Sequence, residues 1–378
     1  MQKPVKSQQG FTVISTALVL VLSTAGALTW SIPRLFGYHP PLHQALPVHC
    51  PASSPVAPAD RPLKVMNWNI QFLAGEYYPY WSSTFDKPPL TEELLDKNLD
   101  RIVEIIRQEQ PDILQLQEVL RSHPITFYQD QLDRLYQKLK DILPCYSYGS
   151  YWKPKLVPQK NMMGPIDLGL VTMSRYQLDS AQLERLPATR NVRVLVPFYP
   201  RHSLMETQLP LENGERLTLI NTHLDAPTLQ RGKMGAQIFR VYQRLTQLTN
   251  AHINWLLTGD FNLIPPGFHE ELPANQQHHY APKSPLVPFY QHFTGIPAIK
   301  DVEQERSRWL TAYDLNTDGL DLIVDYIFHP HYLQSQDSRI RHLPLDISDH
   351  MPVITTIRPI KSHSGTAHPQ TTDSTDDG

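Results

Sequence analysis

Residues 256–265 read LLTGDFNLIP, a run that begins with the apolar side chains of a buried strand and continues into polar ones. Asp260 and Asn262 stand two residues apart, so both point to the same side if the strand continues through Phe261. A carboxylate that is buried without a partner is costly, because its charge loses the solvation of water. This strand end therefore predicts partners for Asp260 elsewhere in the chain.

Other predicted strands end in the same way, with a polar side chain on the face that carries their apolar residues. In chain order these are Asn69 in VMNWN, Glu118 in DILQLQE, His223 in LTLINTH and Asp325 in LDLIVDYI, followed by Asp349 and His350 in ISDHMPV. A buried Asn or His is commonly only hydrogen-bonded, but a buried carboxylate needs a partner for its charge. No Lys or Arg is interleaved with these motifs, so a bound cation is the simplest partner. Oxygen ligands without thiolates favour a hard ion, Mg²⁺ or Mn²⁺.

Histidine supplies the second part of the predicted chemistry. Near neutral pH an imidazole accepts a proton and an imidazolium donates one, so His350 and His223 can serve as base and acid. Hydrolysis of a phosphate ester requires a metal ion that offsets the phosphate charge and a base that takes a proton from water. The residues alone therefore predict a metal-dependent phosphoesterase.

Six short motifs in chain order, NWNIQ, LQEV, NTHLD, GDFN, VDYIF and SDH, resemble those of the endonuclease/exonuclease/phosphatase superfamily, the DNase I-like proteins. Each motif is weak alone, but six in order at the ends of predicted strands form a specific signal. The resemblance covers about residues 64–358. It implies an α+β fold, a four-layer α/β/β/α sandwich of two mixed β-sheets flanked by helices, with the active site at one edge.

The resemblance also implies roles for the residues around the metal. Glu118 would be the main ligand of the divalent ion, with Asn69 and Asp349 as the other metal-site residues. Asp260 would position or activate the attacking water or bind a metal. Asn262 would donate a hydrogen bond to the phosphoryl oxygens as negative charge builds there.

The two histidines receive their roles from the same resemblance. His350 would contact the phosphate or act as the base, and Asp325 would orient it as a dyad partner. His223 would protonate the leaving group or stabilise the phosphate. Gln71 departs from the family, where an acid or Asn is common, so a second tightly bound metal is not expected. Arg201, before a predicted strand, is a candidate phosphate contact, with a surface arginine as the simpler interpretation.

The region between the motifs alternates strands and helices irregularly, which is typical of an α+β domain. Residues 91–110 are expected to form a helix with Thr91 as the cap, and residues 229–252 a second long helix. Residues 265–312 are rich in Pro, His and Tyr, and we expect a loop there. The catalytic domain is predicted to span residues 64–360.

The ends of the chain are predicted to lie outside this domain. Residues 11–32 carry no charge and are long enough for a transmembrane anchor, which would leave 1–10 as a short cytoplasmic tail and the domain outside the cytoplasm. A cleaved signal peptide is the alternative, with a secreted product, since AGA at 25–27 fits a cleavage site. Residues 33–63 form the expected Pro-rich linker, and residues 361–378 a disordered tail.

Composition narrows the function only slightly. The 378 residues are 19% charged and 40% hydrophobic with a net charge of −3, so no basic block indicates nucleic-acid binding. Cys50 and Cys145 could pair in an oxidising compartment. Because Cys50 lies in the expected linker, unpaired thiols are the simpler expectation.

Three functions are consistent with these observations. The first is an anchored phosphoesterase that acts on a lipid head group or a small phosphoester, without an obligate protein partner. The second is an extracytoplasmic nuclease, which would need a basic groove; Lys153, Lys155 and Lys160 could supply part of one. The third, a binding module without activity, is disfavoured because the set of acids and histidines is intact.

Overall fold

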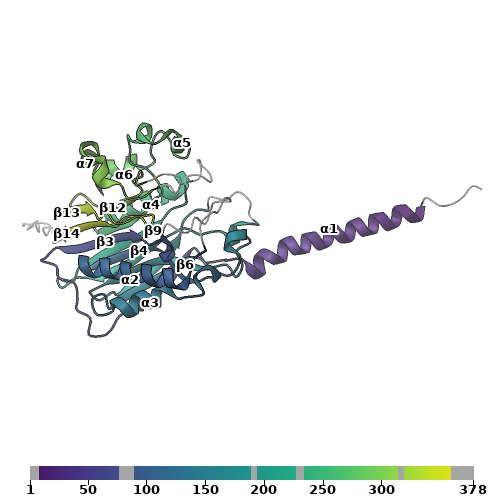
Figure 1. Cartoon of the computed structure of the whole chain (residues 1–378), viewed down its shortest axis with the longest axis horizontal. Helices are drawn as coiled ribbons and strands as arrows, with labels where there is room; N and C mark the ends of the chain where they lie inside the picture. Colours follow the sequence, from purple (N-terminus) through teal and green to yellow (C-terminus); the bar gives the residue numbers. More distant parts are fainter. Residues whose placement is uncertain (1–7, 76–88, 189–193, 227–233, 314–318, 359–378) are drawn as a thin grey trace, which may run out of the picture.

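Two mixed sheets of seven strands each form the body of the chain (Figure 1). The computed structural model describes residues 8–75, 89–188, 194–226, 234–313 and 319–358. The first sheet runs in the order β1 (His43–Leu46), β7 (Ser180–Arg185), β8 (Ser203–Pro210), β9 (Arg216–His223), β10 (Asn254–Asp260), β12 (Asp325–His329) and β11 (Thr294–Ile296). The second runs in the order β13 (Gln334–Ile340), β14 (Val353–Arg358), β3 (Leu63–Asn69), β4 (Ile113–Ser122), β6 (Asp167–Ser174), β5 (Cys145–Trp152) and β2 (Val48–His49).

Each sheet contains one parallel strand pair near its centre. In the second sheet β3 and β4 are joined by helix α2 (Glu92–Glu109), and in the first β9 and β10 are joined by helix α4 (Met234–Asn250). A crossover helix is what a parallel pair requires, because a hairpin cannot connect two strands that run the same way. The carboxyl ends of both pairs lie at the same edge of the sandwich, and this edge carries the predicted site residues.

The helices cover the outer faces of the sheets, as the four-layer prediction requires. Thr91 caps α2 by accepting a hydrogen bond from the backbone N–H of Leu94, and the apolar stripe of the helix is buried against the second sheet. Helix α3 (Gln131–Leu139) lies beside α2, whereas α4 buries its own apolar face against the first sheet. Figure 1 shows α2 and α3 together along one side of the strands. The predicted fold class is therefore confirmed, as is the helix predicted at 91–110.

A layer of amide side chains joins the two sheets in the interior. The Gln117 Nε2 atom donates to Asn67 Oδ1 at 2.8 Å and to Asn221 Oδ1 at 2.7 Å. Asn221 Nδ2 in turn donates to the backbone carbonyls of Leu116 at 3.0 Å and Val171 at 2.9 Å. These side chains are fully buried. Because Asn221 belongs to β9 and its partners belong to the other sheet, the network sets how the sheets lie against each other directly beneath the site.

The N-terminal helix corrects the prediction of a membrane anchor. Helix α1 (Gln8–Phe36) extends away from the sandwich in Figure 1. Within the part of the chain that the structure describes, no helix combines the length and the apolar character that crossing a bilayer requires. Hydroxyl side chains at Ser23, Thr24, Thr29 and Ser31 interrupt the apolar run, and Pro33 and Arg34 follow directly. The predicted membrane location of a single-pass protein is therefore wrong.

The segment expected to be a linker adds a strand to each sheet instead. β1 pairs with β7, and β2 pairs with β5, in both cases antiparallel at the sheet edge. The pairing of β2 brings Cys50 next to Cys145, and the two form a disulfide. The expectation of unpaired thiols was wrong because it treated Cys50 as part of a free spacer.

Other expected segments are only partly regular. Residues 265–312, predicted to be a loop, contain three short helices and strand β11; the helices are α5 (Ala274–Gln277), α6 (Val287–His292) and α7 (Ile299–Gln304). The helix predicted from residue 229 begins at Met234 in the structure, and residues 227–233 lie outside the described residues. The tail predicted at 361–378 and most of the segment 1–10 lie outside them as well.

Candidate active site

The predicted site residues meet at one edge of the sandwich, with the exception of Arg201, which lies to one side. They come from the carboxyl ends of the two parallel pairs, from the start of β12 and from the turn before β14. The set brought together is Asn69, Glu118, His223, Asp260, Asn262, Asp325, Asp349 and His350. Residues that are up to 281 positions apart in the sequence (350 − 69) therefore lie close together.

Close packing of β9 and β10 places Asp260 at the centre. Gly259 precedes it, and a Cβ atom there would lie 2.1 Å from the carbonyl oxygen of Thr222, so only glycine fits. β10 ends at Asp260, whose Oδ1 accepts a hydrogen bond from the backbone N–H of Asn262 at 2.9 Å. Asn262 faces the site because of this turn and its left-handed backbone, and not through continued strand alternation. Phe261 is fully buried on the other side against Tyr326.

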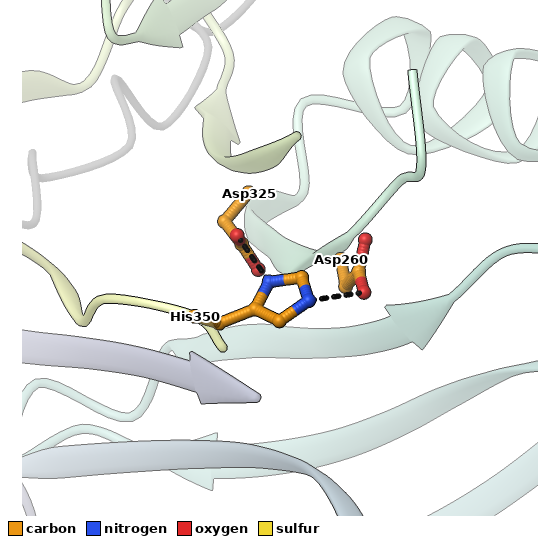
Figure 2. Close-up of side chains that lie close together, drawn as sticks. All are labelled: Asp260, Asp325 and His350. Atoms are coloured by element: carbon orange, nitrogen blue, oxygen red, sulfur yellow. Dashed lines mark hydrogen bonds and ion pairs between the residues drawn. The ribbon is translucent and has the colours of Figure 1, made fainter. Parts of the chain in front are cut away.

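Three groups surround the other carboxylate oxygen of Asp260. Its Oδ2 lies 3.1 Å from Asn69 Nδ2, 3.5 Å from His223 Nε2 and 3.6 Å from His350 Nε2. Figure 2 shows the ring of His350 between the carboxylates of Asp260 and Asp325. Asp260 is thus the point at which the amide and both histidines meet.

His350 and Asp325 form a tight hydrogen-bonded pair. His350 Nδ1 lies 2.7 Å from Asp325 Oδ2 (Figure 2), and β12 supplies Asp325 opposite Asp260 in the strand register. The carbonyl of His350 accepts a hydrogen bond from Trp68 Nε1 at 2.9 Å, and its N–H donates to Ser348 Oγ at 3.1 Å. The imidazole therefore has a fixed position, with Nε2 free to face the site.

The charges around His350 determine its protonation. Burial alone would lower its pKa, but the neighbouring carboxylates of Asp325, Asp260 and Asp349 raise that pKa well above the usual value for histidine. Burial also raises the pKa of Asp325, although the contact with His350 opposes that effect. With no cation beside the acids, His350 carries a proton at neutral pH.

His223 has the opposite electrostatic character. Burial lowers its pKa to about 4, an effect that the charge of Asp260 only partly offsets, so the ring is neutral at physiological pH. Asn262 Nδ2 donates to the carbonyl of Leu224 at 3.0 Å and lies 3.2 Å from His223 Nε2. The Nε2 atom therefore accepts this hydrogen bond, and the proton is on Nδ1, which faces the Tyr151 hydroxyl at 3.3 Å.

Glu118 reaches the site through an irregularity in β4. The register of β4 against β6 shifts between Leu116 and Val119, and Glu118 adopts a left-handed φ of 55°. Such a conformation is unfavourable for a residue with a side chain, and bulges of this type commonly redirect a side chain at a functional site. Burial, together with the charge of Asp349, raises the pKa of Glu118 to about 8.

Asp349 is the second carboxylate of this part of the site. Its pKa is raised to about 6, chiefly by burial and in part by Asp260, while the positive charge of His350 opposes the increase. Its backbone N–H donates to Gln71 Oε1 at 3.3 Å, so Gln71 supports the turn that carries it. Its Oδ1 is buried and has no hydrogen-bond partner in the described residues.

The donor set fits a divalent cation. None of the four carboxylates Glu118, Asp260, Asp325 and Asp349 forms an ion pair with Lys or Arg in the described part of the chain. Side chains of Glu118 and Asp349 are 17% and 22% exposed, so both are accessible to an ion although they are mostly desolvated. Oxygen donors, an unpartnered oxygen on Asp349 and an excess of negative charge all suit a hard ion.

A second grouping of metal-binding type lies in the same place. One ligand atom each from Asp260, Asp325 and His350 lie within 4.8 Å of one another (Figure 2). A metal bound there through Nδ1 of His350 would have to break the 2.7 Å contact with Asp325. The hydrogen bond therefore favours a His–Asp pair over a metal bound through Nδ1.

Asn69 is oriented differently from the predicted ligand. Its Oδ1 accepts a hydrogen bond from the backbone N–H of Gln71 at 3.0 Å. Its amide nitrogen donates to Glu118 at 3.3 Å and to Asp260 at 3.1 Å. The side chain thus presents N–H groups to the acids and holds the two carboxylates at a fixed separation.

Tyr151 and His202 are site residues that the sequence patterns did not indicate. Tyr151 contacts His223 through its hydroxyl, and His202 Nδ1 lies 2.7 Å from the carbonyl oxygen of His223. Their rings are stacked, with centroids 5.6 Å apart. Tyr151 is in β5, which has few aliphatic residues, and His202 precedes β8, so neither stood at the end of a predicted apolar strand.

Comparisons with known proteins agree with the fold. A model described as the Endonuclease/Exonuclease/phosphatase family matches residues 66–350. None of the curated proteins compared matches significantly. Among solved structures, an endonuclease/exonuclease/phosphatase from Beutenbergia cavernae is 20% identical with a TM-score of 0.56. The match covers 79% of this chain and 72% of the Beutenbergia chain.

Two further similar structures are those of named proteins. The human Nocturnin catalytic domain with bound sulfate is 20% identical with a TM-score of 0.50, covering 78% of this chain and 93% of that one. D. rerio TDP2 complexed with a single-stranded DNA product is 14% identical with a TM-score of 0.50, covering 79% and 99%. At these identities the likeness establishes the fold and leaves the substrate open.

Proposed function

The chain belongs to the endonuclease/exonuclease/phosphatase family, and on that premise we propose that it is a divalent-metal-dependent phosphodiesterase. Solved structures that share its fold include phosphoester-hydrolysing enzymes, and the family is generally dependent on divalent metals. The observation that carries the proposal is the group of four carboxylates with two histidines and no Lys or Arg partner in the described residues.

Glu118 and Asp349 would hold the cation, Mg²⁺ or Mn²⁺, and Asn69 would position Glu118 against Asp260. When bound, the ion supplies positive charge that offsets the negative charge of the phosphoryl group. Asn69 donates to both acids, so it keeps them in place whether or not the ion is present. We therefore assign Asn69 a positioning role in place of the predicted ligand role.

His350 would act as the base once the charges of Glu118 and Asp349 are offset. Asp349 is one of the three carboxylates that raise the pKa of His350, after Asp325 and Asp260, so offsetting its charge lowers that pKa and favours a ring whose Nε2 accepts a proton. Asp260 Oδ2 lies 3.6 Å from that Nε2, so both groups can contact one attacking water. Asp325 keeps the ring oriented and stabilises the imidazolium that forms.

His223 would protonate the leaving oxygen only after substrate binding. Its pKa of about 4 leaves it neutral in the free protein, and the negative charge of a bound phosphoester would raise that pKa. Asn262 is engaged with His223 and with the carbonyl of Leu224, so its first role would be to fix the imidazole. Tyr151 supports the opposite nitrogen of the same ring.

A small phosphodiester is the substrate class that these features support best. The lipid head group was expected on the basis of the membrane anchor, which the structure does not support. For a nuclease, Lys153 would have to contribute to a basic groove, but its ammonium is 2.6 Å from Asp167 and is thereby paired. The side chain of Lys160 is outside the described residues.

The test is hydrolysis of bis(p-nitrophenyl) phosphate by the purified protein with Mg²⁺ or Mn²⁺. Glu118→Gln and His350→Ala should each lower kcat by roughly two orders of magnitude or more, because each removes a group that acts directly in the reaction. Glu104→Gln is the matched control, since Glu104 is exposed on α2 away from the site. Full activity in both site variants would refute the mechanism.

A parallel series distinguishes the substrate classes. The rates on bis(p-nitrophenyl) phosphate, p-nitrophenyl phosphate and single- and double-stranded DNA should be compared at low and moderate salt. We expect the small diester to be preferred and its rate to depend weakly on salt. A rate on DNA that is faster and falls steeply with salt would indicate a nuclease instead.

A further inference from the structure

A pair of arginines lies next to the active site, and the proposed reaction leaves both unused. Arg185 ends β7 and Arg201 lies two residues before β8, so both are at the same sheet edge as His223. Arg185 is 2% exposed, and Arg201 is partly buried. Within the described part of the chain neither forms an ion pair with Asp or Glu, whereas Lys64, Arg244 and Arg341, which are partly buried, each pair with an acid.

Arg185 is held entirely by uncharged acceptors. Its Nη1 donates to the carbonyl of Ser150 at 2.6 Å and to Ser203 Oγ at 3.1 Å. Its Nη2 donates to the hydroxyl of Tyr38 and to Gln44 Oε1, both at 2.8 Å. The guanidinium is therefore rigid, yet its charge is not compensated, and its Nε has no partner among the described residues. A buried cation of this kind is costly unless an anion balances it.

Arg201 adds a second charge close to the first. Its Nε is buried and has no hydrogen-bond partner in the described residues. Burial lowers the pKa of both arginines, and the charge of Arg201 lowers that of Arg185 further, so the two guanidinium groups repel each other. Tyr38 interacts with both of them. Two neighbouring guanidinium groups without an acid between them are suited to bind a dianion.

Short contacts connect this pair to the reacting groups. The backbone N–H of Arg201 donates to the carbonyl of Tyr151 at 2.7 Å, and the Tyr151 hydroxyl lies 3.3 Å from His223 Nδ1. His202, the next residue after Arg201, contacts the carbonyl of His223 at 2.7 Å. Arg201 is thus next in sequence to His202, which contacts the proposed acid, His223. It lies on the side of β8 and β5.

We propose that Arg201, with Arg185 and Tyr38 behind it, binds a second phosphate group of the substrate. This inference rests on the proposed function, in which the ester to be cleaved lies at Asp260 and His350. The planar fork of arginine matches the oxygens of a phosphate, and the pair of charges matches a terminal phosphate better than a diester. The substrate class is therefore a phosphodiester that also carries a phosphate monoester.

The test uses two chromogenic esters that differ in one group: thymidine 5′-(p-nitrophenyl phosphate) with and without a 3′-phosphate. The wild type should have a kcat/KM that is roughly tenfold or more higher for the phosphorylated ester, as one or two charged hydrogen bonds would produce. Arg201→Gln should reduce this ratio to below about twofold, chiefly through KM. Arg216→Gln, an exposed arginine at the opposite end of β9, should retain the wild-type ratio.

Two other outcomes would overturn the inference. In the first, the wild type shows no preference between the two esters. In the second, the Arg201→Gln variant loses activity equally on both esters. If Arg201→Gln does not fold, Arg201→Lys replaces it; this variant keeps the charge and loses the fork, and it should lose part of the preference.

A binding measurement separates this inference from the proposed function. If the wild type hydrolyses neither ester, the proposed function fails, and the arginine pair is judged by thermal unfolding with millimolar inorganic phosphate and EDTA. Phosphate should raise the Tm of the wild type and of Arg216→Gln, because the ligand stabilises the folded state. It should not raise the Tm of Arg201→Gln, and an equal increase in all three proteins contradicts the site.

Discussion

At the scale of single residues, the site is held together by Asp260, whose Oδ2 faces one amide and two histidines. His350 is protonated and His223 is neutral, because the carboxylates around His350 outweigh its burial and those around His223 do not. Among the described residues, three carboxylates lie within ion-pair distance of His350, the nearest at 2.7 Å. Two lie within that distance of His223, the nearest at 3.5 Å, beside the neutral contacts of Tyr151 and Asn262. These environments suit the base role that we propose for His350 and the acid role that we propose for His223.

The first prediction concerns the His350–Asp325 pair. Asp325→Asn removes a negative charge 2.7 Å from Nδ1, so the pKa of His350 should fall in the metal-free protein. Because the ring also loses its orientation, kcat should fall by about 10²- to 10⁴-fold. Asp337→Asn is the control, since Asp337 is exposed and its left-handed backbone accommodates Asn. NMR titration of the imidazole and steady-state kinetics measure the two effects, and an unchanged His350 pKa would contradict the dyad.

The second prediction concerns pH and the metal. Burial raises the pKa of Glu118 to about 8 and that of Asp349 to about 6, so both bind protons more tightly than free carboxylic acids. A cation must displace these protons, which means that its affinity is lowest at low pH and increases as the pH rises through 6 to 8. Calorimetric titration with Mg²⁺ at pH 6 and at pH 8.5 should show tighter binding at the higher pH and proton release at the lower. Equal affinity at both pH values would indicate that the ion binds elsewhere.

At the scale of secondary-structure elements, the active-site edge depends on how β9 lies against β3, β4 and β6. The amide layer of Gln117, Asn67 and Asn221 makes this contact without any charged group. The hydrogen bonds that Gln117 and Asn221 donate favour one register between the sheets, because a shift would leave both amide groups and their acceptors without partners. The register in turn places Glu118 and His223 at the same edge.

The third prediction tests this layer. Asn221→Ala removes the hydrogen bonds to Gln117 and to the carbonyls of Leu116 and Val171, leaving buried polar groups without partners. The free energy of unfolding should decrease by about 3 kcal/mol, since each unsatisfied group costs about 1–3 kcal/mol. Urea denaturation measures the change. Asn250→Ala, at the exposed end of α4, should change it by less than about 0.5 kcal/mol, and a similar small loss at Asn221 would show that the layer is unimportant.

The elements also show what the sequence could predict. Strands such as β3, β9 and β10 combine an apolar run with a polar end, so pattern alone located them and the residues at their ends. β5 was not predicted because its buried positions include Cys, Ser and Gly, and Tyr151 was missed together with it. Short edge strands such as β1 and β2 gain their structure only from a partner strand that lies far away in sequence.

Finer features of the site could not be predicted for a related reason. The left-handed backbone of Glu118 arises from a shift of β4 against β6, and the orientation of the Asn69 amide arises from Gln71, Glu118 and Asp260 together. Residue patterns indicate which groups approach the site, but not which atom of each group faces it. This is why the ligand role predicted for Asn69 gives way to a positioning role in the proposed mechanism.

At the scale of the whole molecule, the N-terminal segment is part of the sandwich. It contributes one strand to each sheet, it supplies Tyr38 to the arginine pair, and it is covalently joined to β5. The covalent link is at the start of β5, whereas Tyr151 is near the end of that strand, at the active-site edge. The disulfide and the contact to the proposed acid therefore lie at opposite ends of the same strand.

The last prediction follows from this separation. The Cys50–Cys145 disulfide closes a loop with a sequence separation of 95, and the chain-entropy model gives about 4–5 kcal/mol for a loop of about 100 residues. Cys50→Ser should lower the free energy of unfolding by up to that amount in urea denaturation, while kcat at a temperature where the variant is folded should remain within about twofold. Reductant should destabilise the wild type to the same extent and leave Cys50→Ser unchanged. Equal stability of the wild type with and without reductant would mean that the N-terminal strands are held by pairing alone, and a large loss of kcat would show that the two ends of β5 are coupled.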